Sequence, residues 1–151
     1  MSSLVLAQEV DLRPLLEKVE QRLYKVAVVH SGTVGQLASH VIKAGGKRLR
    51  PQLVILSGWK EKNDWEPVLD VAVAAELLHT ASLIHDDIID HADTRRGLPT
   101  INVVRGNQTA VMAGDYLFAR ALTLLSREST RVPLSLWWNR SRRCVKGLLR
   151  R

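Results

Sequence analysis

ELLHTASLIHDDIID, residues 76–90, is the stretch that decides the fold of this chain. It closes a segment rich in alanine, leucine and valine, which favours one long helix over residues 65–90. Three carboxylates (Asp86, Asp87 and Asp90) stand within five residues near the end of that helix. Because residues four apart share a helix face, we expect Asp86 and Asp90 to project side by side. The sequence therefore predicts a largely buried helix that carries acidic groups at its C-terminal end.

The acidic cluster suits a divalent cation. Three neighbouring carboxylates repel one another unless a cation neutralises them, and acids at a helix C-terminus oppose the helix dipole. Mg²⁺ prefers such hard oxygen ligands and completes its shell with water and phosphate oxygens. The alternative is a solvated acidic helix end, but the isoleucines that flank the cluster (Ile84, Ile88 and Ile89) indicate a partly buried turn. A metal site is thus favoured.

Two basic segments lie before and after this helix. GGKRLRP (residues 45–51) opens a helix, and its glycines allow the backbone to approach a ligand while the helix N-terminus attracts anions. DTRRG (residues 93–97) places two arginines in a loop, where they suit bidentate contacts with phosphate. His79 lies two turns before Asp86 on the same face, either as a core residue or facing a ligand. GGKRLRP alone indicates an anion site, whereas the arginines of DTRRG alone are better explained as a solvated loop.

The rest of the chain reads as an all-α domain. Pro51 is tolerated in a first helical turn, Asp64 can cap the long helix, and a polar loop covers residues 92–100. No strand pattern and no internal repeat competes with this interpretation. The sequence predicts about five helices, over residues 12–26, 34–44, 50–60, 65–90 and 107–126.

Composition excludes several classes of protein. The single cysteine, Cys144, allows no disulfide within the chain, which fits a reducing compartment. The net charge of +7 comes entirely from residues 127–151, which hold eight basic residues and one acid, so residues 1–126 are neutral and no nucleic-acid partner is expected. No signal peptide is recognisable. The most apolar stretch is interrupted by Asp70, Glu76 and His79, so we expect no transmembrane segment and a cytoplasmic protein.

The chain resembles the trans-prenyl diphosphate synthases, the polyprenyl synthetase family. The matching strings are GGKRLRP, ELLHTASLIHDDIID, DTRRGLPT and AVMAGDYLFARAL, and their order covers about residues 35–126. The resemblance implies a partial helical bundle of the isoprenoid synthase type. It also implies a transferase that condenses an allylic diphosphate with isopentenyl diphosphate in isoprenoid biosynthesis.

The resemblance assigns roles to individual residues. Asp86 and Asp90 would bind Mg²⁺, with Asp87 in support, and all three would be catalytic. Lys47, Arg50, His79 and Arg96 would hold isopentenyl diphosphate, and Arg95 would contact the allylic diphosphate. Ala81 and Ser82, one turn before the aspartates, are small, and in this family small residues there indicate a long polyprenyl product.

The chain departs from the family after Ser126. Family members continue into a second aspartate-rich motif, whereas Asp115 is the last aspartate here and Glu128 the only acid after it. We therefore expect a truncated chain that is inactive alone and associates as a homodimer or with a complementing subunit. The basic, tryptophan-containing segment 127–151 indicates a disordered tail and suggests an alternative or out-of-frame 3′ end.

The sequence leaves two other functions open. The first is a non-catalytic fragment or binding module, whose basic tail would contact anions or a membrane surface. The second is a helical metal phosphohydrolase built on the doublet His85-Asp86, which would leave GGKRLRP unexplained.

Overall fold

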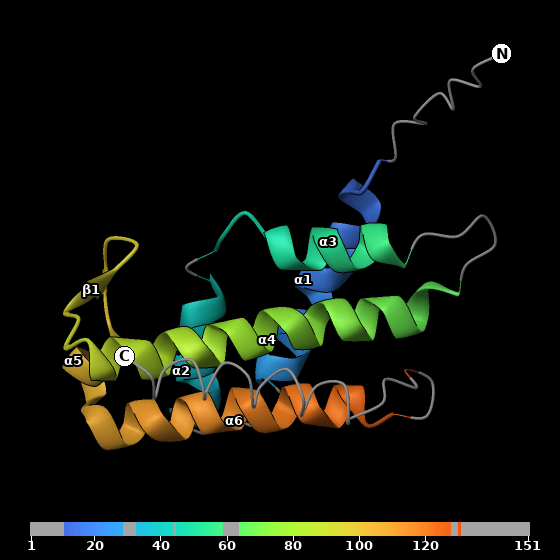
Figure 1. The fold of residues 1–151 in the computed structure, drawn as a ribbon. Helices are drawn as coiled ribbons and strands as arrows, with labels where there is room; N and C mark the ends of the chain where they lie inside the picture. The colour runs from blue at the N-terminus through green and yellow to red at the C-terminus, as the bar shows by residue number, and fades with distance from the viewer. Residues whose placement is uncertain (1–10, 29–32, 44, 59–63, 128–129, 131–151) are drawn as a thin grey trace, which may run out of the picture.

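The structure, a computed structural model, describes residues 11–28, 33–43, 45–58, 64–127 and 130. Within these residues the chain is all-α apart from one short hairpin (Figure 1). The elements are α1 (Arg13–Val28), α2 (Thr33–Lys43), α3 (Leu49–Ser57), α4 (Trp65–Ile89), β1 (Thr94–Arg95), β2 (Leu98–Pro99), α5 (Ile101–Arg105) and α6 (Asn107–Leu125).

The five predicted helices are confirmed as α1, α2, α3, α4 and α6, with small differences at their ends. Asp64 caps α4 as expected, since its Oδ1 accepts a hydrogen bond from the backbone N–H of Glu66 at 3.1 Å. α3 ends at Ser57 rather than near residue 60, and residues 59–63 lie outside the described part of the chain. Local sequence signals therefore determine most of the helical boundaries.

The predicted loop over residues 92–100 is wrong in one respect, because it contains a hairpin. Thr94 pairs with Pro99 and Arg95 with Leu98, and α5 follows directly. Arg96 and Gly97 at the tip have φ values of 53° and 78°, the conformation that a two-residue hairpin turn with matching twist requires. Strands of two residues are too short to produce a visible alternation of polar and apolar residues, so no strand signal is recognisable here.

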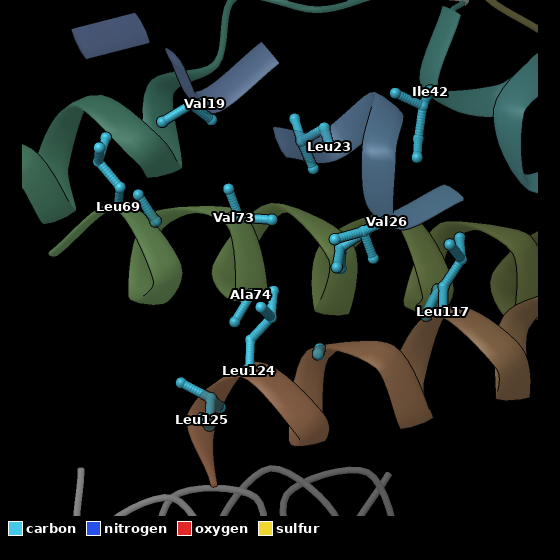
Figure 2. Packing of buried hydrophobic residues seen from close by; sticks show 14 of the residues in the cluster. Val19, Leu23, Val26, Ile42, Leu69, Val73, Ala74, Leu117, Leu124 and Leu125 are labelled. Atoms are coloured by element: carbon cyan, nitrogen blue, oxygen red, sulfur yellow. The ribbon is translucent and has the colours of Figure 1, made fainter. Parts of the chain in front are cut away.

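The long helix α4 is the centre of the bundle. It runs antiparallel to α6, which lies along one side of it, while α3 lies along the other side (Figure 1). α1 also packs on α4, and Val19 and Leu23 of α1 face Val73 of α4 in the core (Figure 2). Each of these three side chains is fully buried, which stabilises the fold by roughly 1.5–3 kcal/mol per side chain.

Small residues let α4 and α6 approach closely. Ala74 of α4 faces Leu124 of α6 (Figure 2). Ala113 of α6 is fully buried. Gly114 allows the closest contact, because a Cβ added there would lie 2.1 Å from Nε2 of His85. His85 therefore occupies the space that the missing side chain leaves.

The helix α4 is also long and apolar enough to cross a membrane, judged by length and composition alone. In this structure 56% of its most apolar window is buried inside the protein. Its apolar side chains pack against α1, α3 and α6, which is the environment of a core helix.

Three buried carboxylates interrupt the apolar surface of α4, and each has an arginine partner from another segment. Asp70 pairs with Arg22 of α1 at 2.8 Å. Glu76 pairs with Arg48 at 3.1 Å, and Asp87 pairs with Arg95 of β1 at 2.6 Å. All three carboxylates are at most 5% exposed, and a buried charge is tolerated only when it is paired and hydrogen-bonded. These pairs therefore fix how the surrounding segments sit on α4.

Candidate functional site

The two basic segments meet over α4. The turn between α2 and α3 carries residues 45–48, and the tip of the β1–β2 hairpin carries Arg96. A Cβ added to Gly46 would lie 3.0 Å from Nη1 of Arg96, so the glycine makes room for the guanidinium. Gly45 has a φ of 72°, a left-handed conformation that glycine adopts readily in the turn after α2.

A pocket with a volume of ≈ 230 Å³ opens where these segments meet. Four predicted diphosphate ligands line it together, although they come from three separate parts of the sequence. Its lining residues are Gly46, Lys47, Arg48, Leu49, Arg50, Glu76, His79 and Arg96. We call this the anion pocket, because one carboxylate stands there among one lysine and three arginine side chains.

His79 titrates differently from a free histidine. Burial lowers its pKa below the ordinary value of 6.5, and the nearby charge of Arg50 lowers this pKa further. Glu76 acts in the opposite direction and raises the pKa, but its effect is smaller than that of burial. The imidazole of His79 is therefore neutral in the free protein at neutral pH and can accept a proton when an anion arrives.

Sequence reasoning missed the role of Arg48. Its side chain donates to Glu20 of α1, to Glu76 of α4 at 3.1 Å and to the carbonyl oxygen of Ile42 at 3.1 Å. The sequence carries no local signal of this arrangement, because both carboxylates lie 28 residues away from Arg48 along the chain. Arg48 lies between two predicted ligands in the sequence, but its own contacts are with other parts of the protein.

The acidic cluster divides into two kinds of carboxylate. Asp86 and Asp90 are exposed at the end of α4. Asp87 is buried and accepts from Nε of Arg95 at 2.7 Å. This hydrogen bond raises the pKa of Arg95 above its usual value, so the arginine is firmly cationic. Arg95, predicted to touch the allylic diphosphate, and Asp87, predicted to support the metal, are thus partners of each other here.

The exposed pair fits a magnesium ion as far as its donors are concerned. Mg²⁺ takes one or two carboxylates and fills the remaining positions with water and phosphate oxygens. Asp86 and Asp90 are one helical turn apart, and neither forms an ion pair within the part of the chain that the structure describes. No group of three or more His, Cys, Asp or Glu side chains placed to hold a metal occurs among the described residues.

A second, smaller cleft of ≈ 50 Å³ adjoins the anion pocket and is mainly apolar. Leu83, Ile84 and Ile101 are among its lining residues, and it shares Arg48, Glu76, His79 and Arg96 with the anion pocket. Neither predicted chain-length residue lines it. Ala81 is 1% exposed in the core, and Ser82 is exposed with its hydroxyl donating to the carbonyl oxygen of His79.

His85 does not join the acidic cluster as a phosphohydrolase would require. Its Nε2 lies 3.3 Å from the carbonyl oxygen of Val111 and 3.5 Å from Oδ1 of Asp115, both on α6. His85 therefore belongs to the α4–α6 contact, whereas Asp86 lies at the exposed end of α4.

The sequence profile of the polyprenyl synthetase family matches residues 32–146, which is more than half of the chain. The chain belongs to the polyprenyl synthetase family. The match continues well past Ser126 and includes most of the basic segment 127–151, and the domain boundary at residue 126 stays a prediction. The predicted disorder of that segment falls almost entirely on residues that the structure does not describe.

Individual members of the polyprenyl synthetase family agree with this assignment. Heptaprenyl diphosphate synthase component 2 of Geobacillus stearothermophilus is 49% identical over 107 residues, which are 71% of this chain and 33% of the relative. A short chain isoprenyl diphosphate synthase of Methanocaldococcus jannaschii is 43% identical over 113 residues, or 75% and 34% of the two chains. The chain thus spans about a third of the length of these curated relatives.

Solved structures of the polyprenyl synthetase family share the fold. The polyprenyl synthase from Caulobacter crescentus, in complex with calcium and isoprenyl diphosphate, superposes with a TM-score of 0.80 at 32% identity. The superposition covers 91% of this chain and 42% of that one. The all-α class and the isoprenoid synthase type of bundle, both expected from the sequence, are confirmed.

Proposed function

We propose that this chain forms the isopentenyl diphosphate-binding wall and the first acidic motif of a prenyltransferase. One observation carries the proposal. Lys47, Arg50, His79 and Arg96, distant in sequence, line a single pocket of ≈ 230 Å³. Three cationic side chains and a protonatable imidazole are suited to the several negative charges of a diphosphate group.

The reaction proposed is the condensation of an allylic diphosphate with isopentenyl diphosphate. The allylic C–O bond breaks, and its electron pair leaves with the diphosphate, so that an allylic cation remains. The double bond of isopentenyl diphosphate attacks this cation, and a new C–C bond forms, which leaves a cation on the former double bond. That cation loses a proton to the released diphosphate or to water, and a new double bond forms. The anion pocket holds the isopentenyl diphosphate through its diphosphate group and so orients the attacking double bond.

Asp86 and Asp90 would hold Mg²⁺ beside the allylic diphosphate, since they are the exposed carboxylates of the cluster. When bound, Mg²⁺ supplies positive charge against the departing diphosphate. The Asp87–Arg95 pair keeps a cationic side chain close to the same helix end. Arg95 contacts the allylic diphosphate only if its guanidinium shares donors between that group and Asp87.

The complete catalytic site needs a second wall. The sequence holds no second aspartate cluster, and the curated relatives are about three times as long as the matched region. We propose that a complementing subunit in the cytoplasm supplies that wall, and a relative named as component 2 of a heptaprenyl diphosphate synthase supports such a subunit. Ala81 and Ser82 line neither the anion pocket nor the apolar cleft, so a long product rests on the family resemblance alone.

Calorimetric titration of the purified chain tests the proposal. We expect binding of isopentenyl diphosphate that weakens at least tenfold in Lys47→Met, because a charge-assisted contact is lost. We also expect Mg²⁺-dependent binding of a non-reactive allylic diphosphate analogue that is lost in Asp86→Ala.

Lys18→Met is the matched control, because it removes one exposed lysine from α1, outside the pocket. It should bind isopentenyl diphosphate as the unmodified chain does. A helical, monodisperse sample that binds neither ligand overturns the proposed function.

A further inference from the structure

Arg48 stands between two proposed ligands of the anion pocket, yet its own guanidinium is already engaged. Only 10% of its side chain is exposed, whereas Lys47 and Arg50 are exposed residues. It lines both the anion pocket and the adjoining apolar cleft, together with Glu76. A third cation at this place invites the interpretation that it, too, binds the diphosphate.

The hydrogen bonds of Arg48 argue otherwise. Nε donates to Glu20, Nη1 donates to Glu76 at 3.1 Å, and Nη2 donates to Glu20 at 3.2 Å and to the carbonyl oxygen of Ile42 at 3.1 Å. An arginine has five N–H donors, so these contacts leave one of them. Burial alone would lower the pKa of Arg48, but the bonds to Glu20 and Glu76 raise it overall, so the charge is retained.

The backbone at this position points the same way. Arg48 is in the left-handed conformation, with φ 48° and ψ 38°, directly before the first residue of α3. This conformation is unfavourable for a residue with a side chain and persists where surrounding contacts hold it. The guanidinium of Arg48 binds α1, α2 and α4 at once, and these contacts hold the backbone of the turn in the left-handed conformation.

We propose that Arg48 is a positioning residue for the anion pocket: by pairing with Glu20 and Glu76, it holds the α2–α3 turn so that Lys47 and Arg50 face one ligand. Glu76 has the same role, because it is the buried carboxylate of α4 to which Arg48 in the turn binds. This inference rests on the proposed function, since the ligand it concerns is the diphosphate group of that substrate.

The effect of Glu76→Gln on isopentenyl diphosphate affinity separates the two roles of Arg48. If Arg48 bound the diphosphate directly, loss of its competing carboxylate would free a cation and strengthen binding. If Arg48 and Glu76 position the turn instead, Glu76→Gln should weaken the binding of isopentenyl diphosphate roughly tenfold. Arg48→Asn should weaken it by a similar factor, and asparagine tolerates the left-handed backbone, so the variant removes the guanidinium and not the turn.

A double-mutant cycle with Lys47 tests the mechanism further. Lys47→Met should cost at least tenfold in affinity in the unmodified chain but about threefold or less in the Arg48→Asn background, because Lys47 is no longer held in place there. A merely structural role would leave the two losses independent. Far-UV circular dichroism of every variant establishes that the helices are intact.

The outcomes distinguish this inference from the proposed function. If the unmodified chain fails to bind isopentenyl diphosphate, both are overturned. If it binds and Lys47→Met weakens binding, while Glu76→Gln strengthens binding or leaves it unchanged, only the positioning role is overturned. Additive losses in the Lys47 and Arg48 variants would overturn it as well.

Discussion

At the scale of single residues, the chemistry of the anion pocket depends on His79. Burial holds its pKa below the ordinary 6.5, so the free protein carries a neutral imidazole at neutral pH. A bound diphosphate brings negative charge close to the ring and raises that pKa. Protonation and binding are therefore linked, and the affinity for isopentenyl diphosphate should rise as pH falls through the pKa of the complex, with the full gain reached below the pKa of the free protein.

The measurement is titration calorimetry between about pH 8 and pH 6 in buffers of different ionisation enthalpy, which reports proton uptake on binding. His79→Gln should abolish the protein's share of that uptake and leave only the titration of the ligand itself. Equal proton uptake by the two proteins would contradict the role of His79.

Low pH should strengthen ligand binding through His79, but it should weaken the stability of the free protein through the same residue. Its pKa is lower in the folded chain than in the unfolded chain, so the unfolded chain binds more protons between these two values. His79 therefore leaves the free energy of unfolding unchanged above about pH 6.5 and lowers it as the pH falls below that value. His79→Gln should show a flatter dependence of urea unfolding on pH over this range.

At the scale of elements, the α4–α6 contact depends on a glycine. A Cβ at position 114 would lie 2.1 Å from Nε2 of His85, far inside contact distance. We expect Gly114→Ala to lower the free energy of unfolding by about 1–3 kcal/mol, because the helices must move apart or His85 must leave its place.

Urea unfolding followed by circular dichroism measures this effect. His85→Ala in the same chain should recover most of the loss, because it removes the ring that the new methyl group meets. If the double variant is as unstable as the two single losses added together, the steric explanation is wrong.

The helices could largely be predicted from the sequence, since their information is local. The Asp64 cap, the long apolar run and the acidic end each mark α4. The hairpin and α5 could not be predicted, because two-residue strands and a five-residue helix are too short for periodicity. The arginine partners of Asp70, Glu76 and Asp87 could not be predicted either, since ion pairs between distant segments leave no local pattern.

At the scale of the whole molecule, the residues of the candidate site could be predicted better than the way in which their segments meet. The residues alone indicated an anion site at GGKRLRP and only a weak one at DTRRG, and the family resemblance assigned Lys47, Arg50, His79 and Arg96 to one ligand. The structure adds that these segments meet over α4, with Gly46 against Arg96. The pairing of Asp87 with Arg95 and the anchoring by Arg48 depend on the tertiary fold, which the motifs do not encode.

The extent of the folded unit is the remaining question at this scale. A domain that ended at residue 126, where the composition changes, would leave Arg127 out. In the structure, Nη1 of Arg127 lies 2.9 Å from Oδ2 of the buried Asp70, and the hydroxyl of Thr130 donates to the carbonyl oxygen of Leu125. We therefore expect Arg127 and Thr130 to contribute to the folded unit.

Two shortened chains test this boundary. A chain that ends at residue 130 keeps the Arg127–Asp70 pair, whereas one that ends at residue 126 leaves Asp70 with Arg22 alone. Because Arg127 is 55% exposed, its pair is worth less than a fully buried one, and we expect the shorter chain to be less stable by about 1 kcal/mol in urea unfolding. Arg127→Met in the chain that ends at 130 should reproduce that loss. Equal stability of the two shortened chains would place the boundary at residue 126 after all, because the contact with Asp70 would then contribute nothing to folding.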